Sequence, residues 1–195
     1  MTGFAEDNTP AYDAPMTKAA FLRWVQRQER RHELIDGRVV MQAGVSKNHA
    51  RLVIGVVTTL CNRLDMDVWA VTASDLAVEI GDNIRYPDVM VEPRDENGQA
   101  LSTTNAVILA EVLSPSSIGT DMTVKLAEYT SLASLEAYIV ASQDEAILWV
   151  WQRDAGTRTF PSKPQGIAGR DGALEIANLS ITLPLAELYR GIATS

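Results

Sequence analysis

The stretch VILAEVLSPSS, residues 107–117, sets Glu111 in the middle of an otherwise apolar run. Side chains alternate between the two faces of a β-strand, so Val107, Leu109, Glu111 and Leu113 would point to one side. An ionised carboxylate left unpaired on such a face would cost several kcal/mol, so Glu111 needs a cation, strong hydrogen-bond donors or a proton. The stretch therefore predicts a strand whose central carboxylate has a partner, and a metal ion would serve.

A second acidic residue, Asp88, lies at the start of another predicted strand. It directly follows Pro87 in the β-prone run PDVMVEP, residues 87–93. Proline has no amide hydrogen, which limits pairing at that end of the strand. Two carboxylates from adjacent strand ends can share a divalent metal ion, so we expect Asp88 and Glu111 to lie together.

The segment SIGTDMTVKLAEYTSLAS, residues 117–134, predicts a helix that follows a short loop containing SPSS. With Met122 at 0°, Leu126 falls at about 40° and Tyr129 at about 340°, so both belong to one apolar stripe. Lys125 falls at about 300°, inside the same stripe. A lysine on the packing side of a helix is uncommon unless its ammonium meets a carboxylate or reaches a cleft. We expect the helix to fold back over the preceding strand, so that the lysine and the two carboxylates converge.

The available side chains favour carboxylate and ammonium chemistry. The sequence contains no GxxxxGK[ST], GxGxxG, GxSxG or HExxH motif, which removes the main support for nucleotide-dependent and serine-hydrolase functions. Cys61, His32 and His49 do not form the usual structural zinc site. We interpret His49 as a surface or capping residue in preference to a catalyst.

Oxygen ligands of this kind favour a hard cation, Mg²⁺ before Ca²⁺, with Mn²⁺ as a substitute. Magnesium beside a lysine suits phosphodiester hydrolysis: the metal would polarise the phosphoryl group, and the ammonium would orient the attacking water or stabilise the transition state. The alternative is a structural ion pair between Glu111 and Lys125, with Asp88 as an ordinary turn residue.

The composition is that of one globular domain. The 195 residues are 46% hydrophobic and 22% charged, and the formal net charge of -8 does not favour nonspecific binding of nucleic acid. Cys61 is the single cysteine, so no intramolecular disulfide can form, and the N-terminal residues lack the pattern of a signal peptide. No apolar segment approaches the roughly 18 residues that cross a bilayer. We therefore expect a cytoplasmic protein with no membrane role.

The order of elements predicts a mixed α/β fold. Residues 1–15 predict a flexible N-terminal arm, and residues 16–195 predict a single domain. Asp36-Gly37 between two β-prone runs has the chemistry of a two-residue hairpin turn, and Ser46 would cap a second amphipathic helix. The remaining elements are strands over 67–72, 75–80, 136–142 and 145–153, then short strands from 173 and a last helical turn. We expect one mixed sheet with helices against it.

The segment FLRWVQRQERR, residues 21–31, predicts a helix with a basic face. At 100° per residue, Arg23, Arg27, Arg30 and Arg31 gather roughly opposite the apolar side chains. These arginines would touch phosphates if the protein binds DNA. The alternative is a solvated surface face.

The run AILWVWQR, residues 146–153, is apolar on both faces of a strand. Such a run fits either a central strand or an oligomer interface. A homodimer would suit an enzyme that must meet both strands of a duplex.

Several of these segments together resemble a known family. HELIDGRVV, YPDVMVEP, ILAEVLSPSS, the VKLAEY helix and EAYIV follow one another as in the Uma-two-type family of restriction endonucleases, within the PD-(D/E)XK nuclease superfamily. The resemblance covers roughly residues 17–150. It implies a restriction-endonuclease-like core, with a mixed central β-sheet flanked by α-helices and a metal-dependent nuclease site.

The resemblance also assigns roles to particular residues. Asp88 matches the aspartate of the PD motif, and Glu111 matches the second acidic position. The superfamily pattern has a lysine two residues after that acid, where this sequence has Leu113. The resemblance implies that the lysine has moved to the following helix, as Lys125. Glu33 matches an acidic residue that many superfamily members contribute from the first helical region, and its alternative is a solvent-facing hairpin residue.

The leading hypothesis is a Mg²⁺-dependent DNA endonuclease. Asp88 and Glu111 would hold the metal, Lys125 would assist the attacking water, and Glu33 would tune the site. Two alternatives stay open. One is a catalytically inactive nuclease-fold protein that acts as a DNA-binding or protein-interaction module. The other is a metal-dependent hydrolase of a small phosphodiester.

Overall fold

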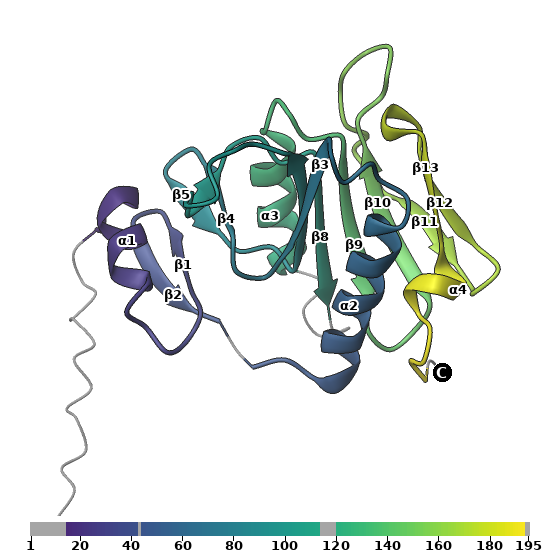
Figure 1. The fold of residues 1–195 in the computed structure, drawn as a ribbon, viewed down its shortest axis with the longest axis horizontal. Helices are drawn as coiled ribbons and strands as arrows, with labels where there is room; N and C mark the ends of the chain where they lie inside the picture. Colours follow the sequence, from purple (N-terminus) through teal and green to yellow (C-terminus); the bar gives the residue numbers. More distant parts are fainter. Residues whose placement is uncertain (1–14, 43, 114–119, 194–195) are drawn as a thin grey trace, which may run out of the picture.

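The computed structural model describes residues 15–42, 44–113 and 120–193. The predicted arm, apart from Pro15, and the SPSS loop lie outside the described residues. The described chain forms a six-stranded sheet, a five-stranded sheet and a two-stranded ribbon, with helices packed against them (Figure 1). The predicted fold class, a mixed sheet flanked by helices, is confirmed.

The six-stranded sheet has the order β11-β10-β9-β8-β6-β3. Its strands are β3 (Trp69–Ala73), β6 (Val89–Pro93), β8 (Ile108–Leu113), β9 (Ala137–Ser142), β10 (Ile147–Gln152) and β11 (Gln165–Ala168). Strands β8 and β9 are parallel, while the other neighbours are antiparallel. Strand β8 is buried at every position before Leu113, which explains its nearly continuous apolar sequence.

The five-stranded sheet has the order β2-β1-β5-β4-β7. Its strands are β1 (His32–Ile35), β2 (Arg38–Met41), β4 (Ala77–Ile80), β5 (Asn83–Arg85) and β7 (Ser102–Thr103). Asp36 and Gly37 both have positive φ, 49° and 76°, as a two-residue hairpin turn requires. The expectation of one sheet was wrong, because the run over 75–80 belongs to this second sheet. A strand pattern identifies a buried face and not the sheet that the face joins.

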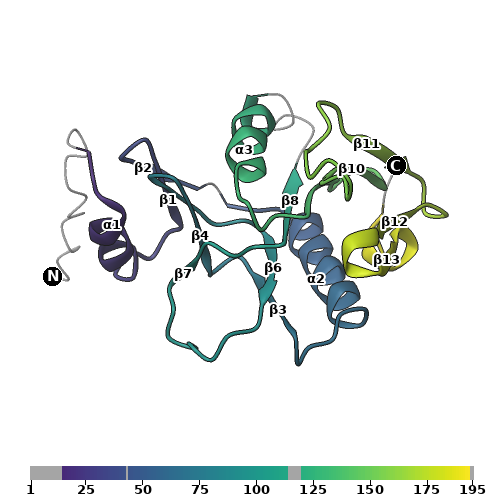
Figure 2. The same ribbon diagram turned by 90° about the horizontal axis from the view of Figure 1, so that it is seen from above.

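Helices α2 (Lys47–Cys61) and α3 (Thr120–Thr130) lie on opposite faces of the six-stranded sheet (Figure 2). Ser46 caps α2 as predicted, because its Oγ accepts a hydrogen bond of 3.1 Å from the His49 amide. Val112 of β8 belongs to the apolar cluster that contains the inner face of α2. Leu109 belongs to the cluster that contains Tyr129 of α3. The odd-numbered side chains of β8, Glu111 among them, therefore face α3.

Helix α1 (Lys18–Val25) is shorter than the sequence predicts. Its apolar residues pack with β1 and β5 in a small core around Phe21, and no buried residue follows Val25 before the chain enters β1. Burial therefore cannot extend the helix through residues 26–31. The predicted helical face of four arginines was wrong: Arg23 lies on α1, while Arg27, Arg30 and Arg31 lie in the segment that follows it.

The C-terminal residues complete the face that α2 covers. They form β12 (Ala173–Ile176), the 3-10 turn η2 (Ala177–Leu179), β13 (Ile181–Pro184) and α4 (Leu185–Leu188). Side chains of β12, β13 and α4 join the same apolar cluster as α2. No helix among the described residues is long and apolar enough to cross a membrane.

Strand β10 is internal, with β9 on one edge and β11 on the other. Leu148 and Val150 join the cluster beneath α2, while Trp149 and Trp151 join the cluster beneath α3. The chain itself therefore covers both faces of this tryptophan-bearing strand. Burial of β10 therefore needs no partner subunit, and the homodimer stays a prediction.

The contact between α2 and α4 depends on Gly55. A Cβ at this position would overlap the backbone carbonyl of Leu188. We expect Gly55→Ala to lower the free energy of unfolding by about 1–3 kcal/mol through overpacking, although alanine favours a helix more than glycine does. Urea unfolding followed by circular dichroism measures the change. Gly98→Ala is the matched control, because nothing lies within 4 Å of a Cβ there.

Candidate functional site

Asp88 and Glu111 lie near each other at one end of β6 and β8, since the charge of Asp88 helps to raise the pKa of the Glu111 carboxyl. In the antiparallel pair of β6 and β8, Val89 lies opposite Ala110. One further step along this register places Asp88, which immediately precedes β6, opposite Glu111. Hydrogen bonding supports this placement, because Oδ2 of Asp88 accepts a bond of 2.8 Å from the amide of Val112. The structure therefore brings the two predicted carboxylates together at one end of the sheet.

Lys125 and Tyr129 of α3 both donate to the carboxylate of Glu111. The distances from Lys125 Nζ and from the Tyr129 hydroxyl to Glu111 Oε1 are each 2.8 Å. The two donors are four residues apart, so they share one face of the helix. Glu111 is 4% exposed and Lys125 is 9% exposed. The lysine predicted to lie on the packing face of the helix is thus buried against the predicted carboxylate.

Burial and charge determine the protonation of this group. Burial raises the pKa of the Glu111 carboxyl, and Lys125 opposes that rise. Burial lowers the pKa of Lys125, but the carboxylates of Glu111 and Glu33 more than offset this effect, so its pKa ends above the usual value. Burial also raises the pKa of the Tyr129 hydroxyl. These directions favour the charged form of Lys125 and the neutral form of Tyr129, and both side chains donate hydrogen bonds to Glu111.

His49 of α2 completes the surroundings of Asp88. Its Nε2 lies 3.1 Å from Asp88 Oδ1, and both side chains are nearly buried. The interpretation of His49 as a surface or capping residue was therefore wrong about its contacts. The cap of α2 comes from Ser46, which fixes the first turn of the helix and so places the imidazole at the end of β6. His49 positions the Asp88 carboxylate from the opposite face of the sheet.

Glu33 lies in a buried charge network beside this group. It is 5% exposed, so the solvent-facing alternative was wrong. Its carboxylate accepts hydrogen bonds from Arg85 Nη1 over 3.0 Å and from the Tyr86 amide over 3.2 Å. Arg85 also donates to Glu128 of α3 from Nε and Nη2, over 2.7 and 2.8 Å. Glu33 therefore sits close enough to raise the pKa of Lys125, but its own hydrogen-bonding partners come from β5 and the residue after it.

Among the described residues, no hydrogen bond or ion pair joins the predicted DNA-binding arginines to Asp88, Glu111, Lys125 or Glu33. Arg23 and Arg27 are exposed, and Arg30 and Arg31 line a cavity next to the end of α1. Arg31 forms a long ion pair of 3.7 Å with Asp75, and Arg30 Nη1 lies 3.4 Å from the Met41 sulfur. Their contact with DNA stays a prediction.

Four residues of the cluster are not among the predicted site residues: His49, Arg85, Glu128 and Tyr129. Glu128 and Tyr129 follow Lys125 by three and four residues, so the same helical wheel could have identified them as neighbours. Tyr129 counted as an apolar residue of the stripe, although its hydroxyl needs a partner when buried. Strand β5 has three residues, which is too short for a pattern to reveal Arg85.

The negative charges of the cluster are only partly neutralised by its lysine and arginine side chains. Arg85 pairs with Glu33 and Glu128, and Lys125 pairs with Glu111. No lysine or arginine in the described part of the chain forms an ion pair with Asp88. Two adjacent carboxylates thus have one ammonium between them, which fits a hard divalent cation. The described residues form no group of three or more potential metal ligands, so water and substrate would supply the rest of the coordination shell.

The chain matches a known family and a solved structure. The sequence model of the Uma2 family, described as "Putative restriction endonuclease", matches residues 19–182. The uncharacterized proteins slr1290 and sll1609 of Synechocystis sp. are 28% identical over 187 residues and 30% identical over 133 residues. The first alignment covers 92% of this chain and 96% of the relative, and the second covers 66% and 75%.

A crystal structure from Anabaena variabilis, described as a putative nuclease belonging to DUF820, has a similar fold. Its TM-score is 0.74 at 17% identity, and the match covers 92% of this chain and all of that chain. At this identity, the likeness shows the fold.

The buried pair of Glu111 and Lys125 makes a prediction for stability. We expect Lys125→Met to lower the free energy of unfolding by about 3 kcal/mol, because it leaves a buried carboxylate without its cation. The double variant Glu111→Gln/Lys125→Met should recover most of that loss, since the two neutral side chains keep the shape of the pair. Urea unfolding in EDTA measures both. Lys18→Met, which breaks the more exposed pair with Glu79, is the control and should cost less than about 1 kcal/mol. Equal losses in all three variants would contradict the prediction.

Proposed function

The chain belongs to the Uma2 family, and from this membership and the geometry of its buried site we propose that it is a metal-dependent DNA endonuclease. One observation carries the proposal: the ammonium of Lys125 is buried against Glu111, next to Asp88, which lies one register step beyond the paired residues of β6 and β8. Asp88, Glu111 and Lys125 come from three separate parts of the fold. A purely structural ion pair between Glu111 and Lys125 would not need Asp88 beside it. Buried groups with shifted pKa values and a shared location are typical of active sites.

The donor set fits Mg²⁺ or Mn²⁺. Asp88 and Glu111 offer carboxylate oxygens and no thiolate, which suits a hard cation. Magnesium usually binds proteins through one or two carboxylates and takes water and substrate phosphate as its other ligands. When bound, the ion would polarise the phosphoryl group and lower the pKa of a water ligand.

The protein's own residues then have distinct tasks. Hydrogen bonds from His49 and Val112 fix the Asp88 carboxylate, and those from Lys125 and Tyr129 fix Glu111. Lys125 stays protonated, so it acts as a cation that orients the attacking water and stabilises the negative charge of the transition state.

Glu33 acts at a greater distance from the reacting atoms. It holds Arg85 and lies near Lys125, whose positive charge it stabilises. We propose that Glu33 tunes the site through Lys125 and does not bind the metal.

Cleavage of supercoiled plasmid tests the proposal. Wild-type protein with Mg²⁺ or Mn²⁺ should convert the plasmid to nicked or linear forms, and EDTA should stop the reaction. Asp88→Asn should reduce the rate by about 100-fold or more, because it removes a charged metal ligand while keeping the size of the side chain. Asp171→Asn is the charge-matched control, because Asp171 is an exposed turn residue that follows β11, and β10 and β9 lie between β11 and β8. Undiminished cutting by Asp88→Asn would refute the assignment.

Binding of Mn²⁺ separates the ligands from the lysine. Calorimetry should show a site that Glu111→Gln and Asp88→Asn both weaken. Lys125→Met should keep or strengthen Mn²⁺ binding, because it removes a competing positive charge, and yet lower the cleavage rate by about 100-fold or more. Wild-type protein that binds no Mn²⁺ would favour the alternative, an inactive nuclease fold that serves as a DNA-binding or protein-interaction module.

A further inference from the structure

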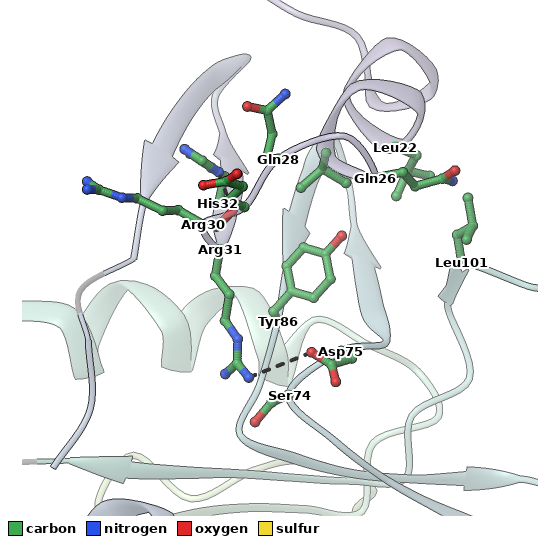
Figure 3. A pocket seen from close by; sticks show the side chains of 12 residues that line it. Leu22, Gln26, Gln28, Arg30, Arg31, His32, Ser74, Asp75, Tyr86 and Leu101 are labelled. Atoms are coloured by element: carbon green, nitrogen blue, oxygen red, sulfur yellow. Dashed lines mark hydrogen bonds and ion pairs between the residues drawn. The ribbon is translucent and has the colours of Figure 1, made fainter. Parts of the chain in front are cut away.

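A cavity of about 340 Å³ lies between the end of α1 and the turn that joins β3 to β4 (Figure 3). The segment over residues 26–31 forms one wall, and Ser74, Asp75 and Tyr86 form the other. We name it the Tyr86 pocket, after the aromatic ring that stands in its centre in Figure 3. Its volume is at the lower end of the range for small-molecule sites, about 300–1,000 Å³. A ligand of the size of one nucleotide is therefore appropriate.

The Tyr86 pocket adjoins the candidate active site. Tyr86 is separated from Asp88 by Pro87 alone, and its amide donates to the Glu33 carboxylate over 3.2 Å. On the same wall, the amide of Ser74 donates to the backbone carbonyl of Asp88 over 3.1 Å. Residues of the candidate active site thus hold this wall in place. A nucleic-acid strand with a phosphate at Asp88 would have a neighbouring nucleotide within reach of this pocket.

The interior of the pocket combines an aromatic ring with apolar neighbours. Tyr86 is half-buried and, like Leu22 and Val25 of α1, packs against the small core around Phe21. Figure 3 shows its ring between Arg31 on one side and Leu22 and Leu101 on the other. Nucleobases stack on such rings, with a contribution of about 1–3 kcal/mol per base.

Two charged side chains at the mouth of the pocket, Arg31 and Asp75, provide a hydrogen-bond donor and a hydrogen-bond acceptor. Arg31 and Asp75 are 3.7 Å apart, and their side chains are 52% and 88% exposed. A pair this long and exposed is weak, so both groups can turn to a ligand. Guanine matches them best, because it offers adjacent N–H donors to a carboxylate on one edge and the O6 and N7 acceptors to an arginine on the other.

The wall that carries Arg31 is fixed before any ligand arrives. Gln28 donates from its amide to Val25 and from its side chain to Trp24, over 3.1 and 3.3 Å. The carbonyl of Arg31 accepts a bond of 2.8 Å from the amide of Gln42. On the opposite wall, Ser74 has a φ of 62°, a conformation that non-glycine residues seldom adopt. A preformed wall reduces the entropy lost when a ligand binds.

We propose that the Tyr86 pocket binds one unpaired guanine base of the DNA strand held at the active site. This inference rests on the proposed nuclease function and adds a preference for the base next to the cleaved phosphate. Tyr86 stacks on the base, Asp75 accepts from its N1–H and amino group, and Arg31 donates to O6 and N7. A base must leave the duplex stack to enter such a pocket, so a single strand should bind more readily than a paired one.

Binding of labelled 12-mers in EDTA tests the proposal without any cleavage step. The probes are oligothymidylate, the same strand with one central dG, dA or dC, and a strand with one central abasic site. Fluorescence anisotropy should give the dG strand an affinity about tenfold higher than the others. Tyr86→Leu and Asp75→Asn should each abolish this ratio. Tyr86→Phe should keep it, because the ring is retained, and Asp171→Asn should keep it as the charge-matched control.

Other outcomes show whether the proposed guanine pocket or the proposed nuclease function is wrong. Equal affinity of wild-type protein for all strands, or no binding, overturns the Tyr86 pocket, even if the protein cuts plasmid. A dG preference that survives in both Tyr86→Leu and Asp75→Asn overturns it too. A dG preference that these variants abolish, in a protein that cuts no plasmid, supports the pocket and refutes the nuclease. Circular dichroism is the check that Tyr86→Leu is folded, and Asp75 is exposed enough for its replacement to leave the core intact.

Discussion

The carboxylate of Glu111 is the constraint on which the arrangement of this protein depends. It lies in a strand that is otherwise apolar and buried, where an uncompensated charge would be costly. Lys125 and Tyr129 compensate it, and both come from α3, so the helix must pack over that part of the sheet. A buried ion pair contributes little net stability compared with apolar residues of the same shape. Stability alone therefore does not explain its presence here.

The same helix joins the two sheets. Within one turn of α3, Lys125 and Tyr129 donate hydrogen bonds to Glu111 of the six-stranded sheet. Glu128 of the same turn accepts hydrogen bonds from Arg85 of the five-stranded sheet. Arg85 in turn holds Glu33 of the first hairpin. The candidate site is therefore the place where both sheets, the hairpin and two helices meet. Its geometry depends on all of them, as the proposed binding of a metal ion and a substrate in fixed positions would require.

Much of the fold follows from local patterns, and the failures have physical reasons. The Asp36-Gly37 turn, the Ser46 cap and the strands around Asp88 and Glu111 are local features, and all of them are present. The basic helix ends at Val25 because the apolar stripe that would hold it ends there. The assignment of strands to two sheets is a long-range property, which no strand pattern contains. His49 was misjudged for the same reason, since its partner Asp88 is 39 residues away.

The sequence by itself determined that Glu111 and Lys125 needed partners. The two-residue period of a strand identified Glu111 as a carboxylate among apolar residues. The 3.6-residue period of a helix identified Lys125 as a lysine on the packing face. Only the tertiary structure decided which groups satisfy them and what surrounds them. Cross-strand register set Asp88 beside Glu111, and the packing of α3 between two sheets added Arg85, Glu128 and Glu33. The physical reason is that periodicity records whether a side chain is buried, while its partner depends on the packing of distant segments.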